Sequence, residues 1–167
     1  IALAVLLSVQ VADAQTKSPD AAKKAVAAAE AAAENPKKAA KVATWVKLAS
    51  SYMDAYNAPA GSAWVGASKQ ELQLLMGGQQ PLAVENVEVG GEALVKETYA
   101  DKDFYFNGAG QLVLIDVTKP VVENALAKAI DAYKKAYEVD VKKSKIKDIT
   151  GGLEIVARKY MDEAMNA

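Results

Sequence analysis

The sequence has neither cysteine nor histidine among its 167 residues. Without cysteine the chain forms no disulfide and offers no thiol nucleophile. Without histidine it lacks the commonest general base and the commonest metal ligand. Arginine occurs once, at Arg158, so the planar fork that proteins favour for binding phosphate and carboxylate groups is scarce. These absences argue against catalysis, and we expect a protein that is not an enzyme and uses no cofactor or metal.

A concentrated positive charge is also missing. The formal net charge is -1 and the isoelectric point is about 5.6, so no basic surface favours nucleic acid. The remaining composition, 51% hydrophobic and 25% charged, is ordinary for a globular chain. We therefore expect a folded protein that has no nucleic acid partner.

Long apolar runs are few, and the one at the N-terminus is short. Residues 1–7 are apolar, and Ala12-Asp13-Ala14 forms an A-x-A cleavage pattern. The run is too short to span a bilayer, which needs about 20 apolar residues. We interpret residues 1–14 as a signal-peptide remnant, with a buried core helix as the alternative. No cysteine follows it, so we expect export without a lipid anchor or a stable membrane span.

Helix signals dominate the next segment. Ser18-Pro19 starts an alanine-rich leader helix within residues 15–35, and Asn35-Pro36 starts a second helix over residues 36–56. Along the second helix, large and small apolar residues recur at helical spacing. They are Trp45, Leu48, Ala49, Tyr52 and Tyr56.

Residues 57–118 have a different character. Ser68 and Glu71 form a capping box that predicts a short helix. Four β-like segments follow, separated by glycine-rich turns, and they predict a small meander or a pair of hairpins. The segments are residues 82–89, 94–99, 103–106 and 112–117.

Helical spacing returns after this region. Lys119-Pro120 starts a helix predicted over residues 119–141, with Ala129, Tyr133 and Ala136 on one side. A lysine-rich connector and a last helix occupy residues 142–167. That helix repeats the earlier intervals, with Leu153, Val156, Ala157 and Tyr160 in place of Trp45, Leu48, Ala49 and Tyr52.

These spacings resemble the tetratricopeptide repeat (TPR), a helix pair of about 34 residues with W-x2-L-G-x2-Y in helix A and A-x3-F in helix B. Trp45 and Ala129 lie much further apart than one such repeat allows, so residues 57–118 look like an insertion between the two helices. The alternative is a generic antiparallel helix pair. The resemblance implies close helix contacts at Ala49, Ala129, Ala136 and Ala157, with aromatic side chains filling the gaps beside them.

The expected fold class is mainly α: TPR-like antiparallel helix pairs at the start of an α-solenoid, with a small β-rich insertion in the first repeat. The chain also looks like an N-terminal fragment, in which the face of Leu153, Val156 and Tyr160 has no covering helix. The expected division is a signal remnant (1–14), a leader helix (15–35), helix A (36–56), the insertion (57–118), helix B (119–141), and a connector with a truncated repeat (142–167).

The resemblance also implies a function. Repeats of this kind bind proteins or peptides in the groove of helix A, here lined by Ala43, Val46, Ser50, Met53 and Asp54. Val46 and Ser50 stand where a carboxylate clamp has lysine and asparagine, so capture of an acidic C-terminal tail is not supported. The chain further resembles exported TPR proteins of Bacteroidota envelopes, which implies a periplasmic or outer-membrane-associated scaffold whose partners are other envelope proteins or peptides.

An exported binding protein for glycans or peptides is the alternative. Its site would lie in the insertion, where Trp64, Tyr99, Phe104 and Tyr105 offer aromatic faces. Paired carboxylates offer the only catalytic candidates, and solvated surface is the better interpretation of each pair. The pairs are Glu85 with Glu88, Asp101 with Asp103, and Asp162 with Glu163.

Overall fold

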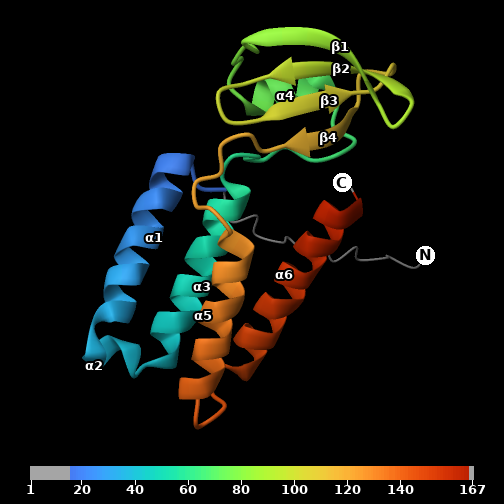
Figure 1. Cartoon of the computed structure of the whole chain (residues 1–167). Helices are drawn as coiled ribbons and strands as arrows, with labels where there is room; N and C mark the ends of the chain where they lie inside the picture. Colours follow the sequence, from blue (N-terminus) through green and yellow to red (C-terminus); the bar gives the residue numbers. More distant parts are fainter. Residues whose placement is uncertain (1–15, 166–167) are drawn as a thin grey trace, which may run out of the picture.

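The computed structural model describes residues 16–165, and within that range it has six helices and one four-stranded sheet (Figure 1). The helices are α1 (Pro19–Glu34), α2 (Pro36–Ala39), α3 (Val42–Asn57), α4 (Lys69–Leu75), α5 (Ala125–Val139) and α6 (Ile146–Met165). The strands are β1 (Ala83–Val89), β2 (Glu92–Thr98), β3 (Asp103–Phe106) and β4 (Leu112–Asp116). The signal remnant expected at residues 1–14 lies outside the described residues.

The fold is mixed α/β, so the expectation of a mainly α fold with a small β-rich insertion is wrong. The strands form an antiparallel meander in the order β1-β2-β3-β4. This sheet module has a hydrophobic core of its own, to which α4 contributes Leu72. The module buries its apolar residues internally and is a second layer of the fold. The buried members of this core are Ala67, Leu72, Tyr99, Phe104, Phe106 and Leu112.

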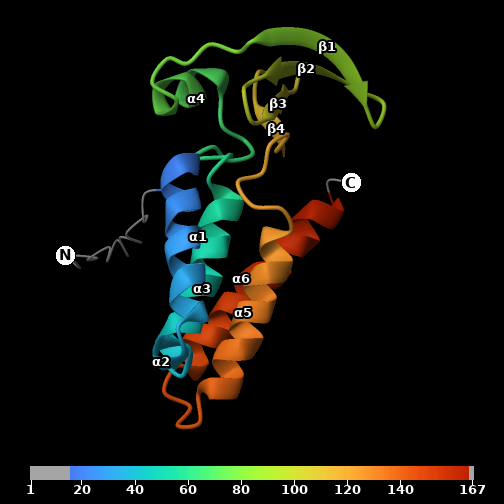
Figure 2. The same cartoon turned by 60° about the vertical axis from the view of Figure 1, so that its left-hand side comes forward.

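The other layer is a helical bundle in which α1, α3, α5 and α6 run alternately up and down (Figures 1 and 2). Helix α3 packs against α1 on one side and against α5 on the other, and α5 also packs against α6. Ala49, Ala129 and Ala136 are fully buried where α3 and α5 meet, while Tyr52 and Tyr133 are buried beside them. Small residues allow a close approach and large ones fill the remaining space, so the expected contacts are confirmed at these five positions.

The last helix differs from expectation. Val156 is buried and Leu153 packs against the same core, because α6 turns back against α5 and α3. The face expected to lack a covering helix is therefore covered over most of its length. Ala157 is exposed, so the burial expected for it at a close helix contact is wrong, and Tyr160 is 41% exposed.

Two helix boundaries also differ. The helix expected over residues 36–56 is broken at residues 40–41 into α2 and α3, and the indole Nε1 of Trp45 donates a hydrogen bond to the carbonyl oxygen of Ala39 across the break at 2.7 Å. Helix α5 starts at Ala125 rather than at residue 119. The intervening residues instead carry the chain from the sheet module back to the bundle.

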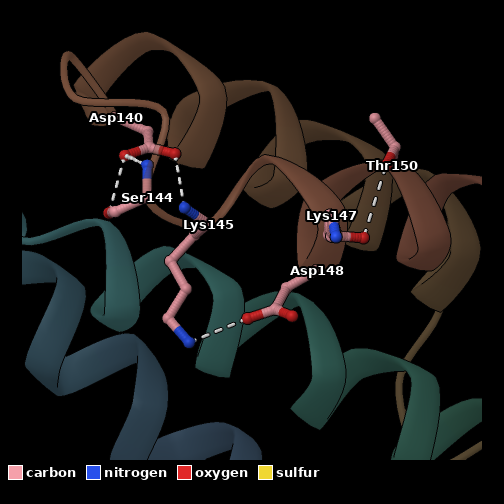
Figure 3. Close-up of polar contacts among 6 residues, drawn as sticks. All are labelled: Asp140, Ser144, Lys145, Lys147, Asp148 and Thr150. Carbon is pink, nitrogen blue, oxygen red and sulfur yellow. Dashed lines mark hydrogen bonds and ion pairs between the residues drawn. The ribbon is translucent and has the colours of Figure 1, made fainter.

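The connector between α5 and α6 is organised by one buried carboxylate, Asp140 (Figure 3). Its Oδ1 accepts hydrogen bonds from the backbone N–H of Ser144 (2.9 Å) and the Ser144 hydroxyl (3.0 Å), and its Oδ2 accepts from the backbone N–H of Lys145 (2.8 Å). Burial raises the pKa of Asp140, but these hydrogen bonds outweigh it and hold the pKa below its usual range. The ionised carboxylate thus fixes the turn that brings α6 against α5.

Candidate functional site

A cleft of about 930 Å³ lies where the helical bundle meets the sheet module. Its walls come from the end of α3, the strand β4, the start of α5 and the end of α6, which are far apart in the sequence. Apolar lining residues include Val65, Leu114, Val117, Pro120, Val122 and Leu126, and the polar or aromatic ones include Tyr56, Asn57, Asp116, Asn124, Lys159, Tyr160, Asp162 and Glu163.

Two crossings of the chain create this cleft. The chain leaves α3 after Asn57 through a turn in which Gly61 adopts a φ of 64°, a conformation that glycine reaches without strain. It returns from β4 through residues 117–124 to the start of α5. Both crossings leave space between the bundle and the sheet module. The end of α6 and the strand β4 both line the open cleft that remains.

The cleft is acidic. Its lining carries three carboxylates, Asp116, Asp162 and Glu163, and one ammonium group, Lys159. Burial raises the pKa of Tyr56, and a hydrogen bond and the charges of Glu163 and Asp162 raise it further. Tyr56 is therefore a neutral phenol beside carboxylates. The cleft can bind a ligand through apolar contacts and negative charge.

Asn124 shapes the wall of the cleft at the start of α5. Its backbone is left-handed (φ 55°, ψ 36°), and its side chain makes no capping hydrogen bond to the helix. This conformation is tolerated by asparagine and glycine but costs about 1–2 kcal/mol for other residues.

We expect Asn124→Ala to lower the free energy of unfolding by about 1 kcal/mol, while Asn124→Gly leaves it within about 0.5 kcal/mol of the wild-type value. Urea unfolding of the three proteins followed by circular dichroism measures both changes. Equal destabilisation by the two substitutions would show that the side chain of Asn124, rather than its backbone, is what matters.

The five residues expected to line a groove on helix A all lie on α3, but α1 packs along the same helix. Ala43 and Ser50 are exposed, and Val46 is half-buried against the core. Met53 is buried, and Asp54 pairs with Lys17. A partner at this face reaches Ala43 and Ser50 directly, whereas Met53 is buried in the bundle core.

The aromatic residues named for a glycan site are mostly inside the sheet module. Phe104 is 1% exposed and Tyr99 is 6% exposed, so neither presents a face to a ligand. Tyr105 is half-buried, and only Trp64, at 48%, is widely exposed. The expectation that these four residues form a stacking surface is wrong, because three of them are wholly or partly enclosed by the sheet module.

One carboxylate expected on the solvated surface is buried. Asp103 is 4% exposed, its Oδ2 lies 2.8 Å from the ammonium of Lys96, and its Oδ1 has no hydrogen-bond partner in the described part of the chain. The carboxylate of Asp101 pairs with the ammonium group of the next residue, Lys102. Within residues 16–165, no group of three or more acidic side chains is placed to hold a metal ion. No helix in that range has the length and apolarity to cross a membrane.

For four of the residues that line the cleft, the sequence predicts other roles. It predicts that Tyr56 and Tyr160 pack against neighbouring helices and that Asp162 and Glu163 lie on the solvated surface. The helical spacing gives no signal for the cleft, because its opposite wall is a strand that no local pattern places beside α6.

Comparison of the chain with protein-family models, with curated proteins and with solved structures found no match.

Proposed function

We propose that this protein is a non-catalytic protein-interaction scaffold of the cell envelope that binds a partner peptide in the cleft between the bundle and the sheet module. The observation that carries the proposal is the cleft of about 930 Å³, whose lining combines apolar side chains with three carboxylates and one ammonium group. That volume lies in the range of ordinary ligand pockets.

The lining indicates the chemistry of the bound segment. Val65 and Val122 offer apolar surface, and the phenol rings of Tyr56 and Tyr160 offer flat faces with polar tips. Asp162 and Glu163 would attract a cation from the partner. A peptide with a bulky apolar residue next to lysine or arginine fits this combination.

The relation to tetratricopeptide repeats is part of the proposal. It is supported by the recurring intervals of Trp45 and Leu153 and by the antiparallel contact of α3 with α5, although the whole sheet module separates them in sequence. Export to the envelope is supported by the A-x-A pattern in residues 1–14.

A peptide library screened against the full chain tests the proposal. We expect selected peptides to carry a basic residue beside an apolar one, and to lose at least about tenfold in affinity when Tyr160→Ala is combined with charge reversal at Asp162 and Glu163. Ile155→Ala is the control, because Ile155 is exposed on the same helix but does not line the cleft. Selected peptides that bind the cleft variant as tightly as the wild type would refute the cleft as the site.

Glycan binding is a second candidate, favoured by one observation: two tyrosines lie in the lining together with the amides of Asn57 and Asn124. Aromatic faces with planar polar groups suit a sugar ring. Binding of the full chain to a glycan array, with loss of that binding on Tyr160→Ala but no selection of basic peptides, would favour this candidate over the peptide.

A further inference from the structure

The two edge strands of the sheet, β1 and β4, differ in how the rest of the chain pairs with them. Beside β4, the backbone of residues 66–68 pairs with the start of the strand: the N–H of Gly66 donates to the carbonyl oxygen of Leu112 (2.7 Å), and the N–H of Leu112 donates to the carbonyl oxygen of Ala67 (2.8 Å). At the other edge, β1 packs substantially only against β2 in the described part of the chain. Figure 1 shows β1 on the side of the sheet away from the helical bundle. The β4 edge is therefore paired at its start and faces the cleft beyond it, whereas the β1 edge is open along its length.

The open edge lacks most of the devices that usually protect such strands. Proteins block an exposed edge with proline, lysine, a bulge or a very short strand. Strand β1 is seven residues long, contains neither proline nor lysine, and pairs with β2 in an unbroken register. Six of its residues are exposed and the seventh, Val87, is half-buried, with Val84 at 57% and Val89 at 41%. Such a strand is suited to pairing with another chain.

The geometry of the hairpin turn between β1 and β2 determines which backbone groups of β1 point away from β2. Gly90 and Gly91 both have positive φ, as a two-residue type I′ turn requires. The pair Val89–Glu92 that flanks this turn is hydrogen-bonded, and hydrogen-bonded pairs alternate along an antiparallel ladder. The N–H and C=O groups of Val84, Asn86 and Glu88 therefore point away from β2, toward the open edge.

The charge along the edge identifies the partner's chemistry. Glu85 and Glu88 lie on β1 and Glu92 lies across the turn, and no lysine or arginine occurs from residue 82 to residue 95. Lys96 stands opposite Glu85, but its ammonium lies 2.8 Å from Asp103. Glu85 and Glu88 are three residues apart and so lie on opposite faces of the strand. A strand placed beside β1 meets a carboxylate on each face.

We propose that β1 is a docking edge for an extended basic segment of a partner protein, which adds to the sheet as a fifth strand. Outward backbone groups supply the hydrogen bonds, Val84, Val87 and Val89 supply apolar cross-strand contacts, and Glu85 and Glu88 select lysine or arginine opposite them. A second copy of this chain fits less well, since two β1 strands would bring Glu85 and Glu88 of both copies into one seam without a cation.

A designed peptide tests this directly on the full chain. Val-Lys-Val-Thr-Lys-Val-Thr, blocked at both ends and labelled with a fluorophore, places its lysines opposite Glu88 and Glu85 in antiparallel pairing. The control peptide has glutamate in place of both lysines. By fluorescence anisotropy we expect the basic peptide to bind at least about fivefold more tightly, and the double variant Glu85→Lys, Glu88→Lys to reverse this preference.

Asn86→Pro separates strand addition from simple charge attraction. It removes one outward N–H but none of the inward ones that pair with β2, so the hairpin should persist while peptide binding falls at least about tenfold. Val84→Pro, which likewise removes an outward N–H without changing the charge, serves if the first proline variant fails to give the wild-type circular dichroism spectrum. The cleft variants at Tyr160, Asp162 and Glu163 should leave this binding unchanged, so failure here and failure of the cleft proposal are distinguishable.

Four results would overturn the docking edge. Equal binding of the two peptides, or binding unchanged in both edge-blocked variants, would mean that β1 is not the site. Absence of binding by either peptide would mean that the edge does not accept a strand. Concentration-dependent dimers that Asn86→Pro abolishes would assign the edge to a second copy of the chain and would refute the basic partner.

Discussion

Between pH 10 and pH 11 we expect the free energy of unfolding to fall by about 3 kcal/mol, because three enclosed tyrosines, Tyr52, Tyr56 and Tyr99, resist ionisation in the folded protein. Tyr52 and Tyr99 are each no more than 7% exposed, and Tyr56 is half-buried. Burial raises the pKa of all three. The hydroxyl of Tyr52 also donates to Glu30 at 2.6 Å, and that of Tyr99 donates to Glu97 at 3.0 Å, so a tyrosinate would face a carboxylate.

The direction of the effect follows from proton binding. In the unfolded chain these phenols ionise near pH 10, whereas in the folded chain they hold their protons to higher pH. Above pH 10 the unfolded state therefore binds fewer protons than the native state. The stabilisation is fully present below pH 10 and is lost as the pH rises, by about 1 kcal/mol for each tyrosine over the first pH unit.

Urea unfolding at pH 9, 10 and 11, followed by circular dichroism, measures this loss. Tyr52→Phe, Tyr56→Phe and Tyr99→Phe should each reduce the dependence on pH by about one third, and the triple variant should remove most of it. The part of the tyrosinate absorbance that the wild type shows and the triple variant lacks should appear together with unfolding. A free energy of unfolding that is constant from pH 9 to pH 11 would contradict the prediction.

Adjacent glycines in α6 should respond in opposite ways to the same substitution. A Cβ atom at Gly152 would lie 2.2 Å from Cζ and 2.3 Å from the hydroxyl oxygen of Tyr133, whereas at Gly151 it would meet nothing within 4 Å. Alanine in a helix is favoured over glycine by about 1 kcal/mol. We expect Gly151→Ala to stabilise by about 0.5–1 kcal/mol and Gly152→Ala to destabilise by about 1–3 kcal/mol, because the buried ring has little room to move.

Thermal unfolding of the two single variants distinguishes them. Combining Gly152→Ala with Tyr133→Leu should cost less than the sum of the two changes, since the shorter side chain removes the clash. If Gly152→Ala stabilises the protein as much as Gly151→Ala, then α6 does not approach α5 as closely as the structure shows.

Local patterns predicted much of the secondary structure. The capping box of Ser68 and Glu71 starts α4 as expected, and the four strands lie within a few residues of the segments with β-like character. The small residues Ala49, Ala129 and Ala136 are buried at helix contacts. These features depend on neighbours in sequence or on helical spacing, which a single sequence displays.

The features that could not be predicted depend on distant parts of the chain. The sequence does not predict that the sheet forms a layer with its own core. That core, around Phe104 and Phe106, forms only when the four strands and α4 come together. The cleft requires β4 to lie opposite the end of α6. Asp103 appeared solvated in a polar stretch, and its burial beside Lys96 follows from the pairing of β2 with β3.

The contact between α3 and α5 has a consequence for the order of folding. The two helices form the bundle's most extensive interface, yet the whole sheet module separates them in the sequence. Joining them from an unfolded chain requires closure of a long loop before any contact offsets the lost entropy. A sheet module that folds first brings Asn57 and Ala125 toward one another and shortens that search. Assembly of the bundle is thus expected to follow the meander, and variants that weaken the sheet should slow folding of helices they do not touch.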